Sequence, residues 1–136
     1  MAYTRSITLP LPFEEAVPAV KAAFQGQGFG ALTEIDVRAT LHEKIGEELE
    51  PYLIIGACNP RLAHRALGAD RQVGALLPCN VVVRQADGGV VVDALDPSVM
   101  IGLSDSPELR PVADEAARLV AAALDELTRS YPAGSR

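Results

Sequence analysis

Two valine-rich runs, residues 80–85 and 89–95, flank the dipeptide Asp87-Gly88. Asp-Gly between β-branched runs favours a two-residue turn whose twist matches that of paired strands, so this stretch predicts a β-hairpin. With the turn at Asp87-Gly88, side chains at alternate positions share a face. One face then carries Val81, Val83, Val90, Val92 and Ala94, and the other carries Val82, Arg84, Val91 and Asp93. The chain is therefore expected to build an antiparallel sheet, with one face of the hairpin only half apolar.

Hydrophobic periodicity supplies the remaining elements. Strands are expected at residues 3–9, 29–37 and 52–58, and helices at 13–25, 37–49 with an interruption at Gly46, 59–67 and 106–131. The resulting order, β-α-β-α-β-α-β-β-α, predicts an α+β fold: a largely antiparallel sheet with helices packed over one face and a long C-terminal helix. The chain has 136 residues, 49% of them apolar, which is enough for a core of its own. Residues 1–136 are expected to form a single domain.

Two of these elements need further comment: a helix that contains a proline, and a strand whose two faces differ in polarity. Pro18 lies inside the first predicted helix, where a proline costs about 3 kcal/mol, so a kink or a late helix start is expected. In the strand 29–37, period-two alternation separates two sets of side chains. Phe29, Ala31, Thr33 and Ile35 are expected on one face, and Glu34 and Asp36 on the other.

The run Tyr52–Cys58 is apolar without alternation, which is typical of a strand covered on both faces. The neighbouring hairpin has a half-apolar face that also needs a cover. A second copy of the chain or a loop would supply that cover, and of these the homodimer is the prediction.

Charge and composition exclude several classes of protein. The net charge of −6 and the pI near 4.8 would repel phosphate backbones, and no cluster of Lys or Arg offsets this, so no nucleic-acid partner is expected. No apolar run approaches the roughly 18–20 residues that cross a bilayer, so no membrane association is expected. The N-terminus lacks the apolar core of a secretory signal, which predicts a cytoplasmic protein with two reduced thiols.

Cap signals mark the starts of two helices. Asn59-Pro60 combines a residue that accepts from free helix amides with one that suits the first turn. Ser106-Pro107-Glu108 repeats this pattern before the long C-terminal helix.

The candidate chemistry lies at two Cys-Asn pairs, Cys58-Asn59 and Cys79-Asn80. Cys58 precedes a predicted helix start, whose partial positive charge favours a thiolate nucleophile. His64 follows in the same helix as a candidate base, and Cys79 is a candidate resolving thiol. The alternative for both cysteines is a small buried side chain at the end of an apolar strand.

Several polar residues are candidate ligand contacts. Asn59, Arg61 and Asn80 lie at predicted element ends, and Arg61, His64 and Arg65 beside a helix start would suit a small anion. Glu34 and Asp36 are candidate acid–base groups, with an exposed sheet face as the alternative. A soft metal held by Cys58, His64 and Cys79 is chemically conceivable, but no metal-binding spacing supports it. The sequence assigns no cofactor.

Four segments together resemble the domain of unknown function 302 family: residues 28–41, Tyr52–Pro60, 63–67 and 76–83. The resemblance covers most of the chain from the first helix to Pro97. It implies a compact α+β fold, often seen as a dimer, and no established reaction. It marks, without assigning roles, Glu34, Asp36, Cys58, Asn59, Pro60, His64, Cys79 and Asn80.

Three hypotheses follow from these observations. The leading one is a small domain that binds an anion or a soft metal near Cys58, His64 and Cys79. The second is a thiol enzyme that uses the same three residues as nucleophile, base and resolving thiol. The third is an interaction module that docks a partner on the half-apolar sheet face.

Overall fold

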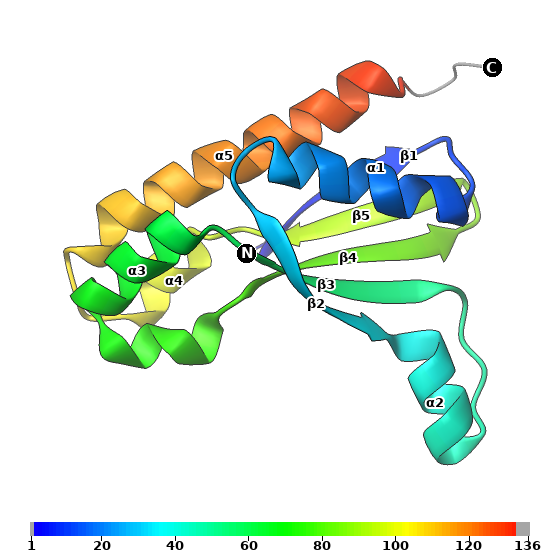
Figure 1. Cartoon of the computed structure of the whole chain (residues 1–136), viewed down its shortest axis with the longest axis horizontal. Helices are drawn as coiled ribbons and strands as arrows, with labels where there is room; N and C mark the ends of the chain where they lie inside the picture. The colour runs from blue at the N-terminus through cyan, green and yellow to red at the C-terminus, as the bar shows by residue number, and fades with distance from the viewer. Residues whose placement is uncertain (1, 133–136) are drawn as a thin grey trace.

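A five-stranded antiparallel sheet with the strand order β1-β5-β4-β3-β2 forms the centre of the molecule (Figure 1). The computed structural model describes residues 2–132. Its strands are β1 (Thr4–Leu9), β2 (Gly30–Asp36), β3 (Tyr52–Cys58), β4 (Cys79–Ala86) and β5 (Gly89–Leu95). Its helices are α1 (Phe13–Gln25), α2 (Val37–Ile45), α3 (Pro60–Ala69), the 3-10 helix η1 (Arg71–Leu76), α4 (Val99–Leu103) and α5 (Leu109–Ser130).

The predicted α+β class and element order are confirmed, with two additions. The short helices η1 and α4 occupy stretches that sequence periodicity left unassigned. Helices α1 and α5 lie side by side over one face of the sheet, α3 and α4 gather at one end of it, and α2 projects at the other (Figure 1). None of the helices formed by residues 2–132 combines the length and the apolar character needed to span a bilayer.

The β4–β5 hairpin has the predicted turn and the predicted faces. Ala86 lies opposite Gly89, which leaves Asp87-Gly88 as the two-residue turn. On the side toward α1 and α5, which we call the covered face, the five predicted residues are each no more than 2% exposed: Val81, Val83, Val90, Val92 and Ala94. The opposite side, which we call the open face, is partly exposed and carries Asn80, Val82, Arg84, Val91, Asp93 and Leu95.

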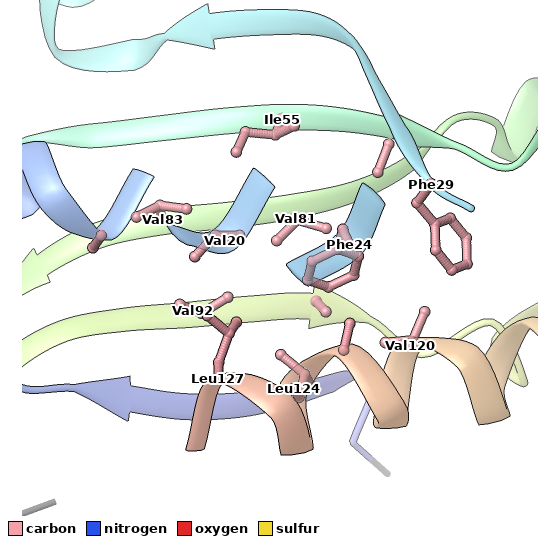
Figure 2. Packing of buried hydrophobic residues seen from close by; sticks show 14 of the residues in the cluster. Val20, Phe24, Phe29, Ile55, Val81, Val83, Val92, Val120, Leu124 and Leu127 are labelled. Carbon is pink, nitrogen blue, oxygen red and sulfur yellow. The ribbon is translucent and has the colours of Figure 1, made fainter. Parts of the chain in front are cut away.

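Apolar side chains from α1 and α5 fill the space above the covered face. Figure 2 shows how they meet the sheet, with Val20, Phe24, Val120, Leu124 and Leu127 from the helices against Ile55, Val81, Val83 and Val92 from the strands. The rings of Phe24 and Phe29 meet edge to face at 5.9 Å between centroids. Burying each aliphatic or aromatic side chain of this size stabilises the fold by about 1.5–3 kcal/mol, so this cluster holds the two helices on the sheet.

A second apolar cluster lies at the end of the sheet where α3, η1, α4 and α5 meet. It contains Leu62, Ala66, Val73, Met100, Leu109, Val112, Ala113 and Ala116. Because this cluster is built almost entirely from helices, its position depends on how the loops around β3 and β4 direct the chain.

Helix α1 begins at Phe13 and continues through Pro18, so the late start predicted as one alternative is wrong. The missing amide of Pro18 would have bonded the carbonyl of Glu14. Both residues are exposed, and water can satisfy that carbonyl. The proline therefore lies where its cost is smallest.

Strand β2 departs from the predicted alternation because its register shifts between Ala31 and Thr33. Ala31 lies opposite Ala57 on the covered side, whereas Thr33 lies opposite Gly56 on the open side. The extra residue of this β-bulge is Leu32, and one inserted residue reverses the facing of everything after it. The prediction that Ala31, Thr33 and Ile35 share a face is therefore wrong.

The C-terminal helix starts at Leu109, later than its cap signal predicts. The single proton of the Ser106 hydroxyl has two acceptors within reach, the carbonyl of Ala69 and Glu108 Oε1, each 3.0 Å from Oγ. Ser106 thus joins the chain before α5 to the end of α3, and Glu108 takes the cap position without a hydrogen bond from its side chain to a helix amide.

Helix α2 projects from the end of β2, and its main contacts are with β2 and β3. None of its residues is buried. It is bounded by Asp36, whose side chain accepts from the amide of Ala39 at 2.9 Å, and by Gly46, which has the left-handed φ of 69°. The predicted interruption at Gly46 is confirmed and ends the helix, so the predicted continuation to residue 49 does not form.

Strand β3 is covered on both faces only near Gly56. A Cβ at this position would overlap Thr33 Oγ1 and lie 2.8 Å from Pro78 Cγ, so the site requires glycine. Farther along the open face lies a depression of about 440 Å³ that is lined by strand residues and Tyr3, with no helix residue. Within one chain, Tyr52–Cys58 is therefore covered on both sides only at the Gly56 end, and cover for the rest of its open face stays a prediction.

Candidate functional site

Both cysteines line one small pocket at the end of the sheet. The pocket has a volume of about 30 Å³, and its walls come from the ends of β3 and β4 and from α3, α4 and α5. Among the described residues that line it, none is charged. We call this cavity the thiol pocket; its apolar walls include Phe29, Leu62, Ala66, Val112 and Ala116.

Strand pairing brings the two thiols together. Cys58 is the last residue of β3 and Cys79 is the first residue of β4. In an antiparallel pair the end of one strand lies beside the start of the next, and Ala57 lies directly opposite Cys79. The chain between the cysteines, which contains α3 and η1, returns to the same end of the sheet.

Asn59 has the structural role that the sequence predicts. Its Oδ1 accepts from the amide of Leu62 at 3.3 Å and caps α3, with Pro60 in the first turn. Its Nδ2 donates to the carbonyl of Gln27 at 3.4 Å. A Cβ on Gly28, which has a φ of +89°, would lie 2.9 Å from that Nδ2. The amide of Asn59 is therefore committed to backbone groups of two segments.

Cys79 is the more buried of the two cysteines, at 8% exposure. Burial, and to a smaller extent a negative charge on Cys58, raise the pKa of its thiol from 9.0 to about 11. At neutral pH Cys79 is a protonated thiol. Cys58 is partly exposed at the pocket and is the better placed of the two for contact with a solute.

His64 is separated from the thiol pocket. It is exposed, and it does not belong to the pocket lining. With 3.6 residues per turn, a residue two positions from both Leu62 and Ala66 points away from the side that those two bury. The proposed set Cys58, His64 and Cys79 is therefore not assembled, and the described residues contain no group of three His, Cys, Asp or Glu side chains placed to hold a metal.

The two carboxylates of β2 also lie away from the thiols and have local partners. Glu34 forms an ion pair with Lys21 of α1. Asp36 caps α2.

The two asparagines of the Cys-Asn pairs lie in different places. Asn80 follows Cys79 but points to the open face, because successive residues of a strand alternate. The two Cys-Asn pairs thus bring their cysteines together and keep their asparagines apart.

A polar groove of about 570 Å³ lies on the other side of the α3 start. Arg61 and Arg65 line it, and Arg65 Nη1 donates to Glu115 Oε1 at 2.7 Å. That hydrogen bond lowers the pKa of Glu115. Asn59 and Leu62 line both the groove and the thiol pocket, so the two cavities are neighbours.

Met100 is the lining residue that sequence reasoning missed. It lies on α4, is 3% exposed, and faces the same pocket as the two cysteines. The only available signal was composition: the chain has two methionines, and Met100 is the internal one. Periodicity gave no reason to place it near Cys58 or Cys79.

Comparisons with known proteins agree with the fold. A search of the curated proteins found no match. A solved structure from Bacillus stearothermophilus, described as an uncharacterized conserved protein DUF302, is similar, with a TM-score of 0.86 and 28% sequence identity. The similarity covers 93% of this chain and 99% of that one. The family model for the domain of unknown function DUF302 matches residues 5–127, so the chain belongs to the DUF302 family.

Proposed function

We propose that this domain binds a small ligand in the thiol pocket, with Cys58 and Cys79 as its contacts. The observation that carries the proposal is that both cysteines of the chain line one pocket whose other walls are mainly apolar. Two thiols beside each other in apolar surroundings favour a thiophilic or uncharged ligand. An anion is supported less well, because the arginines Arg61 and Arg65 line the neighbouring groove instead.

The size of the pocket limits the ligand. Organic ligands usually occupy clefts of about 300–1,000 Å³, whereas this pocket has about 30 Å³. One water needs roughly 10–15 Å³ by a comparable measure. The pocket as it stands therefore suits an ion or a ligand of very few atoms, and a larger ligand would extend past Asn59 into the groove.

Binding is favoured over thiol catalysis by the position of His64. A thiol enzyme needs a thiolate nucleophile and a base within hydrogen-bond reach. The exposed His64 does not line the pocket, and burial keeps Cys79 protonated. Cys58 is the remaining nucleophile candidate. An alkylation rate for Cys58 that is already at its plateau at pH 6 would favour the enzymatic alternative.

The ligand can be sought in protein purified natively under reducing, oxygen-free conditions. Native mass spectrometry, elemental analysis and a free-thiol count should together show one small adduct or metal per chain. Ala63→Leu fills the pocket from α3 and should remove the adduct while it leaves both thiols in place. His64→Ala is the matched control on the exposed side of the same helix and should retain it.

Two results would contradict the proposal. One is a wild-type chain that carries no adduct or metal in any preparation. The other is equal occupancy in wild type and Ala63→Leu, which would place the ligand elsewhere. If Cys58→Ala and Cys79→Ala melt far below wild type with unchanged occupancy, the cysteines are structural.

We also propose a homodimer formed through the open face, in the reducing cytoplasm where both thiols stay free. A two-fold interface is formed by one self-complementary patch on both chains, and the open face combines opposite charges, Arg84 and Asp93, with partly exposed valines. Light scattering at micromolar concentration should give the mass of two chains. Val91→Glu should give one chain, and Gln25→Glu, at the exposed end of α1, should not. A monomeric mass for the wild type would contradict the proposed dimer and favour docking of another protein on this face.

A further inference from the structure

The internal sulfur atoms of this chain belong to three residues that line one cavity. The sequence contains two cysteines and two methionines, and one of the methionines is the first residue. The other three, Cys58, Cys79 and Met100, all line the thiol pocket. They come from three different elements: the end of β3, the start of β4 and α4.

The chemistry of these donors selects the kind of ion. Thiolates and thioethers are soft ligands that suit soft metals such as Cu(I), whereas Mg²⁺ and Ca²⁺ need oxygen ligands. Structural Zn²⁺ sites need four Cys or His ligands. Among its described residues the pocket has no carboxylate or imidazole, and its volume of about 30 Å³ has room for a single ion.

We propose that Cys58, Cys79 and Met100 form a binding site for one soft monovalent metal ion of the Cu(I) class. This proposal rests on the proposed function, since it names the ligand of the same pocket. Each thiol gives up one proton to solvent and forms one metal–sulfur bond. Met100 donates a sulfur lone pair with no proton change, so M⁺ plus two R–SH gives a complex of charge −1 and two released protons.

The surroundings fit a complex of that charge. The N-terminus of α3 begins at Asn59-Pro60 beside the pocket, and the positive end of a helix dipole stabilises nearby negative charge. Arg61 and Arg65 line the adjoining groove on the other side of Leu62.

Hydrogen bonds fix the backbone of α4, the helix that carries the third sulfur. Asp96 Oδ1 accepts a hydrogen bond from the amide of Ser98 at 3.0 Å, and the carbonyl of Asp96 accepts one from the amide of Val99 at 3.0 Å. Val99 is the first residue of α4. The amide of Asp96 itself donates to the carbonyl of Tyr3 at 2.9 Å. The start of α4 is therefore held relative to the sheet that carries both cysteines, and the buried side chain of Met100 lines the same pocket as they do.

The alternative is that Met100 only fills space, as methionine often does in irregular cores. Met100→Leu separates the two, because it keeps the side-chain volume and removes the sulfur. The reduced, full-length protein would be titrated with Cu(I) without oxygen, against the chromophoric chelator bicinchoninate. X-ray absorption at the copper edge would then count the sulfur ligands.

Wild type should bind one Cu(I) per chain with three sulfur ligands. Cys58→Ser and Cys79→Ser should each weaken binding by more than about 100-fold, beyond the 10–100-fold cost of losing a supporting partner. Met100→Leu should leave two sulfur ligands and weaken binding about tenfold, because a thioether is a weaker donor than a thiolate. His64→Ala should match wild type.

Three results would overturn the site. The first is that Cu(I) does not bind in a fixed ratio to the chain. The second is that Met100→Leu keeps the three sulfur ligands of wild type. The third is a nitrogen ligand that disappears in His64→Ala. If Cu(I) fails to bind but the natively purified chain carries another adduct that Ala63→Leu removes, only this inference fails. If neither is found, the proposed function fails with it.

Discussion

The two faces of the sheet are built from the same strands and largely the same residue types, yet they differ in what completes them. Val83 on the covered face is fully buried under helices, while its neighbour Val82 on the open face is partly exposed. Polar contacts finish the open face: Asp93 accepts from Arg84 Nε at 2.8 Å and from Ser6 Oγ at 2.6 Å. Valine content alone thus does not decide burial, because the chain supplies a helical cover for only one side.

The largest expected effect comes from comparing two variants that each place one carboxylate on β4, one on the covered face and one on the open face. Val83→Asp buries an unpaired charge and should cost more than about 4 kcal/mol of unfolding free energy, enough to unfold many domains. Val82→Asp should cost less than about 1 kcal/mol when the chain is monomeric. Urea unfolding at low protein concentration measures both. Equal losses would mean that the open face is as closed as the covered one.

A second prediction uses Cys79, at the edge of the covered face. Its folded pKa of about 11 lies above the ordinary value of 9.0, so the folded state holds the proton more tightly than the unfolded state. This stabilisation is complete below pH 9 and is lost as the pH rises to 11, by roughly 2–3 kcal/mol at about 1.4 kcal/mol per pH unit.

Cys79→Val provides the control for the other groups that titrate in this range. The difference in unfolding free energy between wild type and Cys79→Val should change across pH 9–11, while Asn80→Ala, on the open face, should track wild type. A constant difference would show that the Cys79 thiol reaches water.

The smallest effect concerns the Arg84–Asp93 pair on the open face. Its side chains are 35% and 19% exposed, so the coupling measured by a double-mutant cycle should be about 1 kcal/mol or less and should weaken in salt. Arg84→Ala, Asp93→Ala and the double variant complete the cycle. A coupling above about 2 kcal/mol that survives 1 M salt would mean that the pair is desolvated, as in a sealed dimer.

Most of the fold could be predicted from local sequence signals. The Asp87-Gly88 turn and the Asn59 cap each act within a few residues, so the sequence contains everything that decides them. The Leu32 bulge escaped prediction because strict period-two alternation assumes that no residue is inserted. Ser106 escaped because its partner, the carbonyl of Ala69, lies in a segment distant in sequence.

The candidate site was predicted only in part, for the same reason. The nearness of Cys58 to Cys79 follows from β3 pairing with β4, which is a long-range property. Met100 enters the pocket through α4, a helix too short to show a period. The exclusion of His64 was within reach of helical geometry, since Leu62 and Ala66 already fix which side of α3 is buried.

The bulge at Leu32 also bears on aggregation. Strand β2 is at the edge of the sheet, and an edge strand offers unpaired amide and carbonyl groups on which foreign strands can stack. The register shift between Ala31 and Thr33 interrupts that row and bends it, and charged Glu34 and Asp36 follow directly. An incoming strand would find no long straight template, so the exposed side chains of Leu32 and Ile35 can remain in water without seeding fibres.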